Sequence, residues 1–194
     1  MEYIIATCAG IALAAACGLR VFLPLLVLGL GAKLGLMPLG ANFAWLASTP
    51  ALLALAVATV VEVVVFYVPV LDHALDAVVS PLAMIAGAFA AVAVWPDGTP
   101  EYLRWTVGIV AGASVSASTQ ATTVVTRAAS TLTTGGLANF LVSTLEAALA
   151  MVTAVVAIVA PVLAAHFVIL LAVLLGRWVL RRGKLAPVPA AANP

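Results

Sequence analysis

The chain has 194 residues, of which 65% are apolar and only 8% charged, and its net charge is +1. A soluble domain is about 45–50% apolar and about 25% charged, and a globule of this size has too little interior to bury the excess. Disorder is excluded because it needs low hydrophobicity and high charge. At roughly 20 residues per crossing helix, we expect an all-α, polytopic protein with about six spans in a lipid bilayer.

The predicted spans fall into two repeats and a tail. The first repeat, residues 1–95, holds spans at 3–31, 51–71 and 81–95, the first of them broken near 18–24 by Gly-Leu-Arg and a proline. The second repeat, residues 102–182, holds spans at 102–118, 137–160 and 162–180. Residues 183–194 form a polar, Pro/Ala-rich tail, which we expect to be poorly ordered.

The two halves share an order of features. Each has a small-residue span, a lone arginine (Arg20 or Arg127), glycines, and then Ser-Thr (48–49 or 143–144). Three spans per repeat would make the second copy inverted in the membrane, an arrangement common in transporters with a site near the midplane. The alternative is a chance alignment of Ala/Val-rich segments.

Basic residues set the expected orientation. Arg177, Arg181, Arg182 and Lys184 flank the last span, and the positive-inside tendency places this end in the cytoplasm. Six spans would then put the N-terminus there too. Small-residue faces on the first, third and fourth spans could pair with a second copy, so we expect a homodimer.

Four charged residues are candidates for a substrate or ion pathway. Glu62 lies about twelve residues into an apolar helix, where a charge costs about 2.5–3.5 kcal/mol and needs a partner or a proton. Arg20 and Arg127 lie at breaks, and Glu146 lies early in the fifth span, so we expect each arginine to contact a carboxylate. An anionic substrate could compete for the same guanidinium donors. The alternative roles are structural ion pairing and, for the arginines, snorkelling to the interface.

Residues 114–136 are unusually rich in hydroxyl groups. Thr119, Gln120, Thr123 and Thr126 precede Arg127, and two glycines follow. We interpret the stretch as a broken or re-entrant helix lining the pathway, because irregular backbone in hydrocarbon must be buried or line water. Residues 21–31, too short to cross alone, are its candidate mate. A cytoplasmic loop with interhelical Ser/Thr hydrogen bonds is the alternative.

A third candidate site is the sequence Asp72-His73-x-x-Asp76. Its carboxylates at i and i+4, with an imidazole beside one of them, could hold a cation weakly. The alternative role of Asp72 is to cap a short helix. No zinc-ligand cluster, phosphate-binding glycine loop or nucleophile elbow is present, and no basic run suits nucleic acid. We therefore expect neither an enzyme nor a nucleic-acid-binding protein, with no cofactor and no resident metal.

Several short motifs together resemble a known family. They are Gly18-Leu19-Arg20-Val21-Phe22-Leu23-Pro24-Leu25, Glu62, Pro69-Val70-Leu71-Asp72-His73, Pro81-Leu82-Ala83, Ala86-Gly87-Ala88, and Gly135-Gly136 with Asn139, Ser143 and Glu146. In this order they look like the bacterial membrane family called domain of unknown function 4126. That family has an Asp-Lys pair where this chain has Phe66-Tyr67, and an Arg where it has Ser80. The resemblance implies a bacterial membrane fold, which we expect in the inner (plasma) membrane, and it implies no activity.

Two functions remain open from the sequence. One is a small permease, channel or flippase for a small polar or anionic group. The other is a non-transporting helical scaffold or assembly subunit of a membrane complex. In a transporter, polar residues should line an aqueous path across the membrane. In a scaffold, they should pair with one another.

Overall fold

The computed structural model describes residues 1–66 and 72–183, without the side chains of 72–76, 175 and 178–183, and these residues form helices without strands. In chain order the elements are α1 (Glu2–Leu19), α2 (Phe22–Lys33), the 3-10 helix η1 (Ala41–Ala47), α3 (Thr49–Val65), α4 (Asp72–Ala93), α5 (Glu101–Val107), the π-helical η2 (Gly108–Ala113), α6 (Ser114–Thr134), α7 (Asn139–Val159) and α8 (Pro161–Gly183). The expected all-α class is confirmed.

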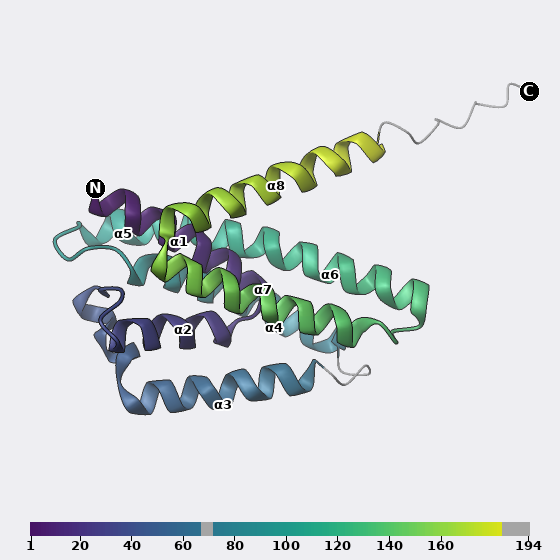
Figure 1. The fold of residues 1–194 in the computed structure, drawn as a ribbon, viewed down its shortest axis with the longest axis horizontal. Helices are drawn as coiled ribbons and strands as arrows, with labels where there is room; N and C mark the ends of the chain where they lie inside the picture. The colour runs from purple at the N-terminus through teal and green to yellow at the C-terminus, as the bar shows by residue number, and fades with distance from the viewer. Residues whose placement is uncertain (67–71, 184–194) are drawn as a thin grey trace, which may run out of the picture.

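A sharp reversal separates α1 from α2. Arg20 has an extended backbone (φ −147°, ψ 134°), which ends α1 and lets α2 begin at Phe22. Figure 1 shows α1 running inward from one end of the bundle and α2 returning toward that same end. The interruption that the sequence predicts near residues 18–24 is therefore a helical hairpin whose turn lies inside the bundle. Pro24 is accommodated because it falls in the first turn of α2.

α1 is the central helix, and its small residues allow close packing. It packs against α4, α6, α7 and α8. A Cβ on Gly10 would lie 3.2 Å from the Cα of Ala91, and a Cβ on Gly18 would lie 2.5 Å from the carbonyl oxygen of Ser116. These small faces are thus used within one chain. The homodimer expected from these faces stays a prediction.

The hydroxyl-rich stretch is continuous helix, so the predicted break within 114–136 is wrong, as is the alternative of a loop. α5, η2 and α6 follow one another without a gap, and α6 ends at Thr134, followed by Gly135 with a φ of 64°. The reason is that the hydroxyls bond within the helix: Ser118 donates to the Ser114 carbonyl and Thr122 to the Ser118 carbonyl. The irregularity lies upstream, in the π-helical turn of η2.

The two halves of the chain differ in local structure at the positions that the proposed repeat pairs with each other. Ser48 precedes α3 and its hydroxyl accepts a hydrogen bond from the Ala51 N–H, whereas Ser143 lies inside α7. The first half has the α1–α2 reversal, but the corresponding helix of the second half runs straight on into α6. The inverted repeat therefore remains a prediction.

The helices are compatible with a membrane, although fewer than six qualify as spans. Within the described ranges, α1 and α7 are long and apolar enough to cross a bilayer, and η1 with α3, bent by 64°, would be a third if the pair forms one span. α2 and parts of α4 and α8 are shorter apolar helices. The outward faces of α3 and α7 are apolar, with Val60, Val64, Leu145 and Val152 exposed. Such a large apolar exterior suits hydrocarbon better than water.

Interactions at one end of the bundle connect several segments. Arg104 of α5 is buried, and its Nη2 donates to the Pro96 carbonyl at 2.9 Å and lies 3.6 Å from a carboxylate oxygen of Asp97. The same oxygen accepts a hydrogen bond from the N–H of Ala41. The start of α1 lies at this end, and α8 extends toward the other end (Figure 1).

Candidate functional site

Four charged side chains from different parts of the chain are buried in the bundle. Arg20, at the α1–α2 turn, is 1% exposed, and Arg127 of α6 is 2% exposed. Glu62 of α3 and Glu146 of α7 are 7% and 5% exposed. We call these four residues the charged quartet. Its formal charge sums to zero, which a low-dielectric interior requires of so many buried ions.

Glu146 is shared by both arginines. Nη2 of Arg127 donates a hydrogen bond to Oε2 of Glu146, and Nη2 of Arg20 lies 3.3 Å from the same oxygen. Arg20 also donates to the carbonyl oxygen of Ser143 at 2.8 Å and to its hydroxyl. The expected contact between each arginine and a carboxylate is therefore present, with one glutamate serving both.

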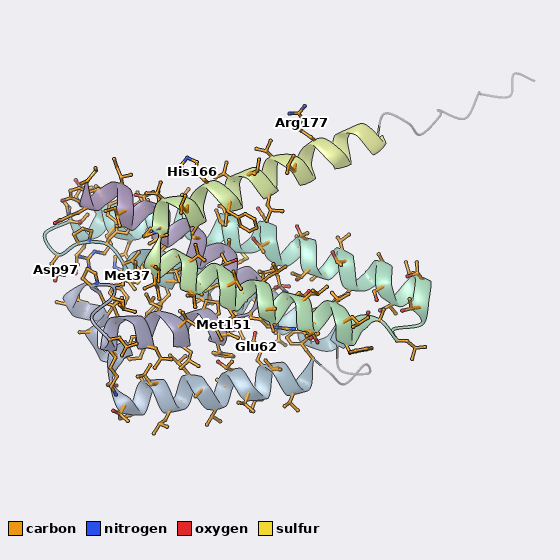
Figure 2. All side chains as sticks on the ribbon, in the orientation of Figure 1. Met37, Glu62, Asp97, Met151, His166 and Arg177 are labelled. Carbon is orange, nitrogen blue, oxygen red and sulfur yellow. The ribbon has the colours of Figure 1, made fainter. Side chains whose placement is uncertain are left out.

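The side chain of Glu62 reaches from α3 to the start of α2. Its Oε1 accepts a hydrogen bond from the Val21 N–H at 2.7 Å, and its Oε2 accepts one from the Phe22 N–H at 3.1 Å. The first N–H groups of a helix have no partner within the helix and carry partial positive charge. A carboxylate from α3 thus caps α2, and Figure 2 shows Glu62 between these two helices.

Phe66 joins the two arginines through its ring. The Cζ atoms of Arg20 and Arg127 lie 4.3 Å and 4.1 Å from the ring centroid, within the range of a cation–π interaction. This contact of Phe66 with both arginines was not predicted from the sequence. A usable signal was its position four residues after Glu62, on the same face of α3.

Ser143 is the other residue that sequence reasoning missed. It is buried on α7, three residues before Glu146, so both side chains face the guanidinium of Arg20. Its carbonyl and hydroxyl oxygens supply acceptors that a second carboxylate would otherwise have to provide. In the sequence, Ser143 appeared only as part of a family motif and of the proposed repeat, and neither pattern indicated that it would contact Arg20.

The hydroxyl-bearing candidates on α6 divide into buried and exposed positions. Gln120 and Thr123 are buried, Thr119 is half-buried, and Thr126 is exposed. The three threonine hydroxyls donate to backbone carbonyls of α6 itself. Nε2 of Gln120 is buried and has no hydrogen-bond partner among the described residues. Arg127 thus belongs to the quartet, while the hydroxyls of Thr119, Thr123 and Thr126 mostly serve their own helix.

The weak cation site cannot be placed. Asp72, His73 and Asp76 belong to the first turns of α4, but their side chains lie outside the described residues. The arrangement expected of the two carboxylates and the imidazole therefore stays a prediction.

A cavity of about 740 Å³ adjoins Glu62 and Phe66, and we call it the α3 groove. Its lining comes from α2 and the residue before it (Val21, Phe22), α3 and the residue after it (Leu53, Ala54, Val57, Ala58, Val61, Glu62, Val65, Phe66) and α4 (Val78, Val79, Leu82). This volume lies within the range of about 300–1,000 Å³ typical of ligand cavities. Among the described residues that line the groove, Glu62 alone is charged.

The fold and the site together define an all-helical protein with an apolar exterior and a buried charged quartet beside a helix reversal. The chain belongs to the family described as Domain of unknown function (DUF4126), whose profile matches residues 7–182. The match includes the whole quartet and confirms the family suggested by the sequence motifs. No curated protein and no solved structure matches the chain.

Proposed function

We propose that this chain is a small permease- or flippase-type transporter that moves a small polar or anionic group across the membrane. The observation that supports this proposal is the contact of two buried arginines with one carboxylate beside an interrupted helix. Charged residues within membrane helices commonly mark substrate or ion pathways. An anionic group that reached Arg127 would compete with Glu146 for the guanidinium, and the released carboxylate would then bind a proton.

The proposal includes an orientation in the bacterial inner membrane. The basic flank of α8 favours a cytoplasmic location for that end. Because α1 starts at the opposite end of the bundle, we propose that its start faces the other side, in place of the shared cytoplasmic side expected from six spans. The α1–α2 hairpin would then enter and leave the membrane on one side. The inverted repeat and the homodimer remain compatible with this arrangement and are not required by it.

Flux measurements test the proposal. The purified protein would be reconstituted into proteoliposomes loaded with chloride, phosphate or acetate. The flux of each anion across the vesicle membrane would then be compared for the unmodified chain, Arg127→Gln and Glu62→Gln. We expect each variant to lose flux while it remains folded. Arg177→Gln is the matched control, because Arg177 is exposed on α8 and points away from the bundle (Figure 2). Absence of flux for every solute, with the protein folded, would count against transport of soluble groups.

A scaffold is the second candidate, and the mutual pairing of the quartet favours it. Arg20 and Arg127 contact Glu146, and Glu62 binds backbone N–H groups, so these polar atoms are engaged within the chain. Removing one partner of a buried pair is strongly destabilising, whereas removing both is often neutral. On the scaffold hypothesis, Arg127→Gln and Glu146→Gln each lower stability, their combination recovers part of it, and no variant affects flux.

A further inference from the structure

The α3 groove exists because α3 lies apart from the rest of the bundle. α3 packs along α2 and against η1, and the cavity separates it from α4. Five of the lining residues are also among the exposed apolar residues of the surface: Leu53, Val57, Val61, Val78 and Leu82. The groove therefore opens on the side of the bundle, where a bilayer would supply hydrocarbon, and its inner wall reaches the quartet at Glu62.

The chemistry of the wall limits what can occupy the groove. Every described lining side chain except that of Glu62 is apolar, so a hydrated ion would lose its water shell with little replacement from them. A hydrocarbon chain, in contrast, gains from burial against Ala58, Val65 and Leu82. The carboxylate of Glu62 accepts one backbone hydrogen bond on each oxygen, and a carboxylate has about four acceptor positions. It can therefore accept further hydrogen bonds from a donor in the groove.

We propose that the α3 groove binds an amphiphile from the bilayer, with its hydrocarbon chain along α3 and an ammonium or hydroxyl head at Glu62. Charge complementarity at the wall favours such a head, because Glu62 is the charged group among the described lining side chains. The guanidinium groups of Arg20 and Arg127 lie against the ring of Phe66 and are not part of the lining. The inference goes beyond the proposed transport function, because it gives the groove a ligand class of its own and does not depend on an anionic group reaching Arg127. Binding itself requires no transport, so the two can fail separately.

Native mass spectrometry of the purified chain tests the binding. The probes are hexadecylamine, hexadecanol and hexadecanoate, which share one chain length and differ only in the head. We expect one bound amine or alcohol, held about tenfold or more tightly than the carboxylate, because charge-assisted hydrogen bonds contribute at least that factor. Equal binding of the three probes, or preference for the carboxylate, would overturn the assignment of the head.

Two tryptophan variants of α3 separate the groove from general attachment of lipid. Ala58→Trp fills the groove and should abolish probe binding, whereas Val60→Trp, on the exposed face of the same helix and outside the lining, should leave it unchanged. Glu62→Gln should remove the preference for hexadecylamine over hexadecanoate, while the groove should still bind the hydrocarbon chain of each probe. If Glu62→Gln does not fold, the comparison of Ala58→Trp with Val60→Trp still shows whether the probes bind in the groove. One outcome would overturn the proposal: the unmodified protein is a dimer without bound probe, and Ala58→Trp converts that dimer to a monomer. A second copy of the chain would then be the occupant of the groove.

Combining the two experiments distinguishes the two proposals. If the amphiphile binds as expected but neither a labelled phospholipid nor a soluble anion crosses the vesicle membrane, the groove assignment holds and the transport function fails. If soluble anions cross equally well with and without Ala58→Trp and no probe binds, the transport function holds and the groove assignment fails.

Discussion

Arg20 and Arg127 approach the same carboxylate oxygen, Oε2 of Glu146, although they come from the α1–α2 turn and from α6. Their guanidinium groups also share the ring of Phe66. Two like charges are thus held together by one anion and one aromatic ring. This sharing makes the contributions of the four residues interdependent, and it leads to specific expectations for single substitutions.

Glu146→Gln removes the anion common to both arginines. We expect a loss of about 3–5 kcal/mol in the free energy of unfolding, because two buried cations then lack their shared counter-charge. Chemical unfolding in detergent, followed by circular dichroism, measures it. Glu101→Gln, at an exposed position in the first turn of α5, is the control and should change stability little. A stable Glu146→Gln protein would show that Glu146 is not needed as a counter-charge.

Glu62→Gln should loosen the start of α2. The amide keeps one acceptor oxygen but turns an NH₂ group toward the second backbone N–H, so one of the two capping bonds is lost. We expect about 1–2 kcal/mol of local destabilisation, the usual cost of losing a helix cap. Hydrogen exchange at the amides of Val21 and Phe22 reports it directly. Thr59→Val serves as control, since its hydroxyl donates within α3 to the Leu55 carbonyl.

Phe66→Leu removes the aromatic face and keeps an apolar side chain. Two cation–π contacts disappear, each worth about 0.5–2 kcal/mol, and a smaller side chain remains in the buried position. Unfolding should occur at lower denaturant concentration, and Phe66→Trp should retain more stability than Phe66→Leu. Phe140→Leu, at an exposed position on α7, is the control. Equal stability of the leucine and tryptophan variants would contradict a role for the ring.

Gly18→Ala should separate α1 from α6. The added Cβ would lie 2.5 Å from the Ser116 carbonyl oxygen and 2.6 Å from the Thr119 Cβ, and neither atom can move without shifting α6. We expect a loss of about 1–3 kcal/mol, as for other overpacked cores. Gly176→Ala on α8 is the matched control. It meets no atom within 4 Å and should stabilise the helix by up to about 1 kcal/mol. Equal thermal midpoints for the two variants would contradict this close packing.

Reporter fusions test the orientation. A reporter placed after Pro194 should behave as cytoplasmic, and one placed before α1 should behave as periplasmic, because α1 starts and α8 ends at opposite ends of the bundle. Both reporters on the cytoplasmic side would instead support six crossings. A periplasmic reporter after Pro194 would contradict the orientation set by the basic flank of α8.

Much of the site followed from simple energetics in the sequence. Charged residues in apolar helices must meet partners, which directed attention to Arg20, Glu62, Arg127 and Glu146 before any geometry was known. The rule does not say which partner each finds. Glu62 was expected beside an arginine in a relay or ion pair, and its direct hydrogen bonds go to backbone N–H groups that only the reversal at Arg20 exposes.

The hydroxyl-rich stretch was misinterpreted for a physical reason. Serine and threonine are weak helix formers when they compete for backbone bonds, yet in α6 they bond to carbonyls three or four residues earlier and remain helical. Composition alone cannot distinguish these two outcomes. The small-residue faces of the first, third and fourth predicted spans indicated close helix packing, but they could not show that such contacts form within one chain.

The π turn of η2 has a consequence for rotational phase. On an uninterrupted α-helix, Arg104 and Arg127, 23 residues apart, would point about 140° away from each other. Both are buried here, one beside Pro96 and the other beside Glu146. A π turn takes more residues per turn than an α-helix and so resets the phase between them. Deleting one residue from η2 would convert it to regular α-helix and leave the two arginines about 40° apart, so both guanidinium groups would stay in their clusters. Deleting one residue between η2 and Arg127 would instead turn the guanidinium of Arg127 by about 100°, away from Glu146.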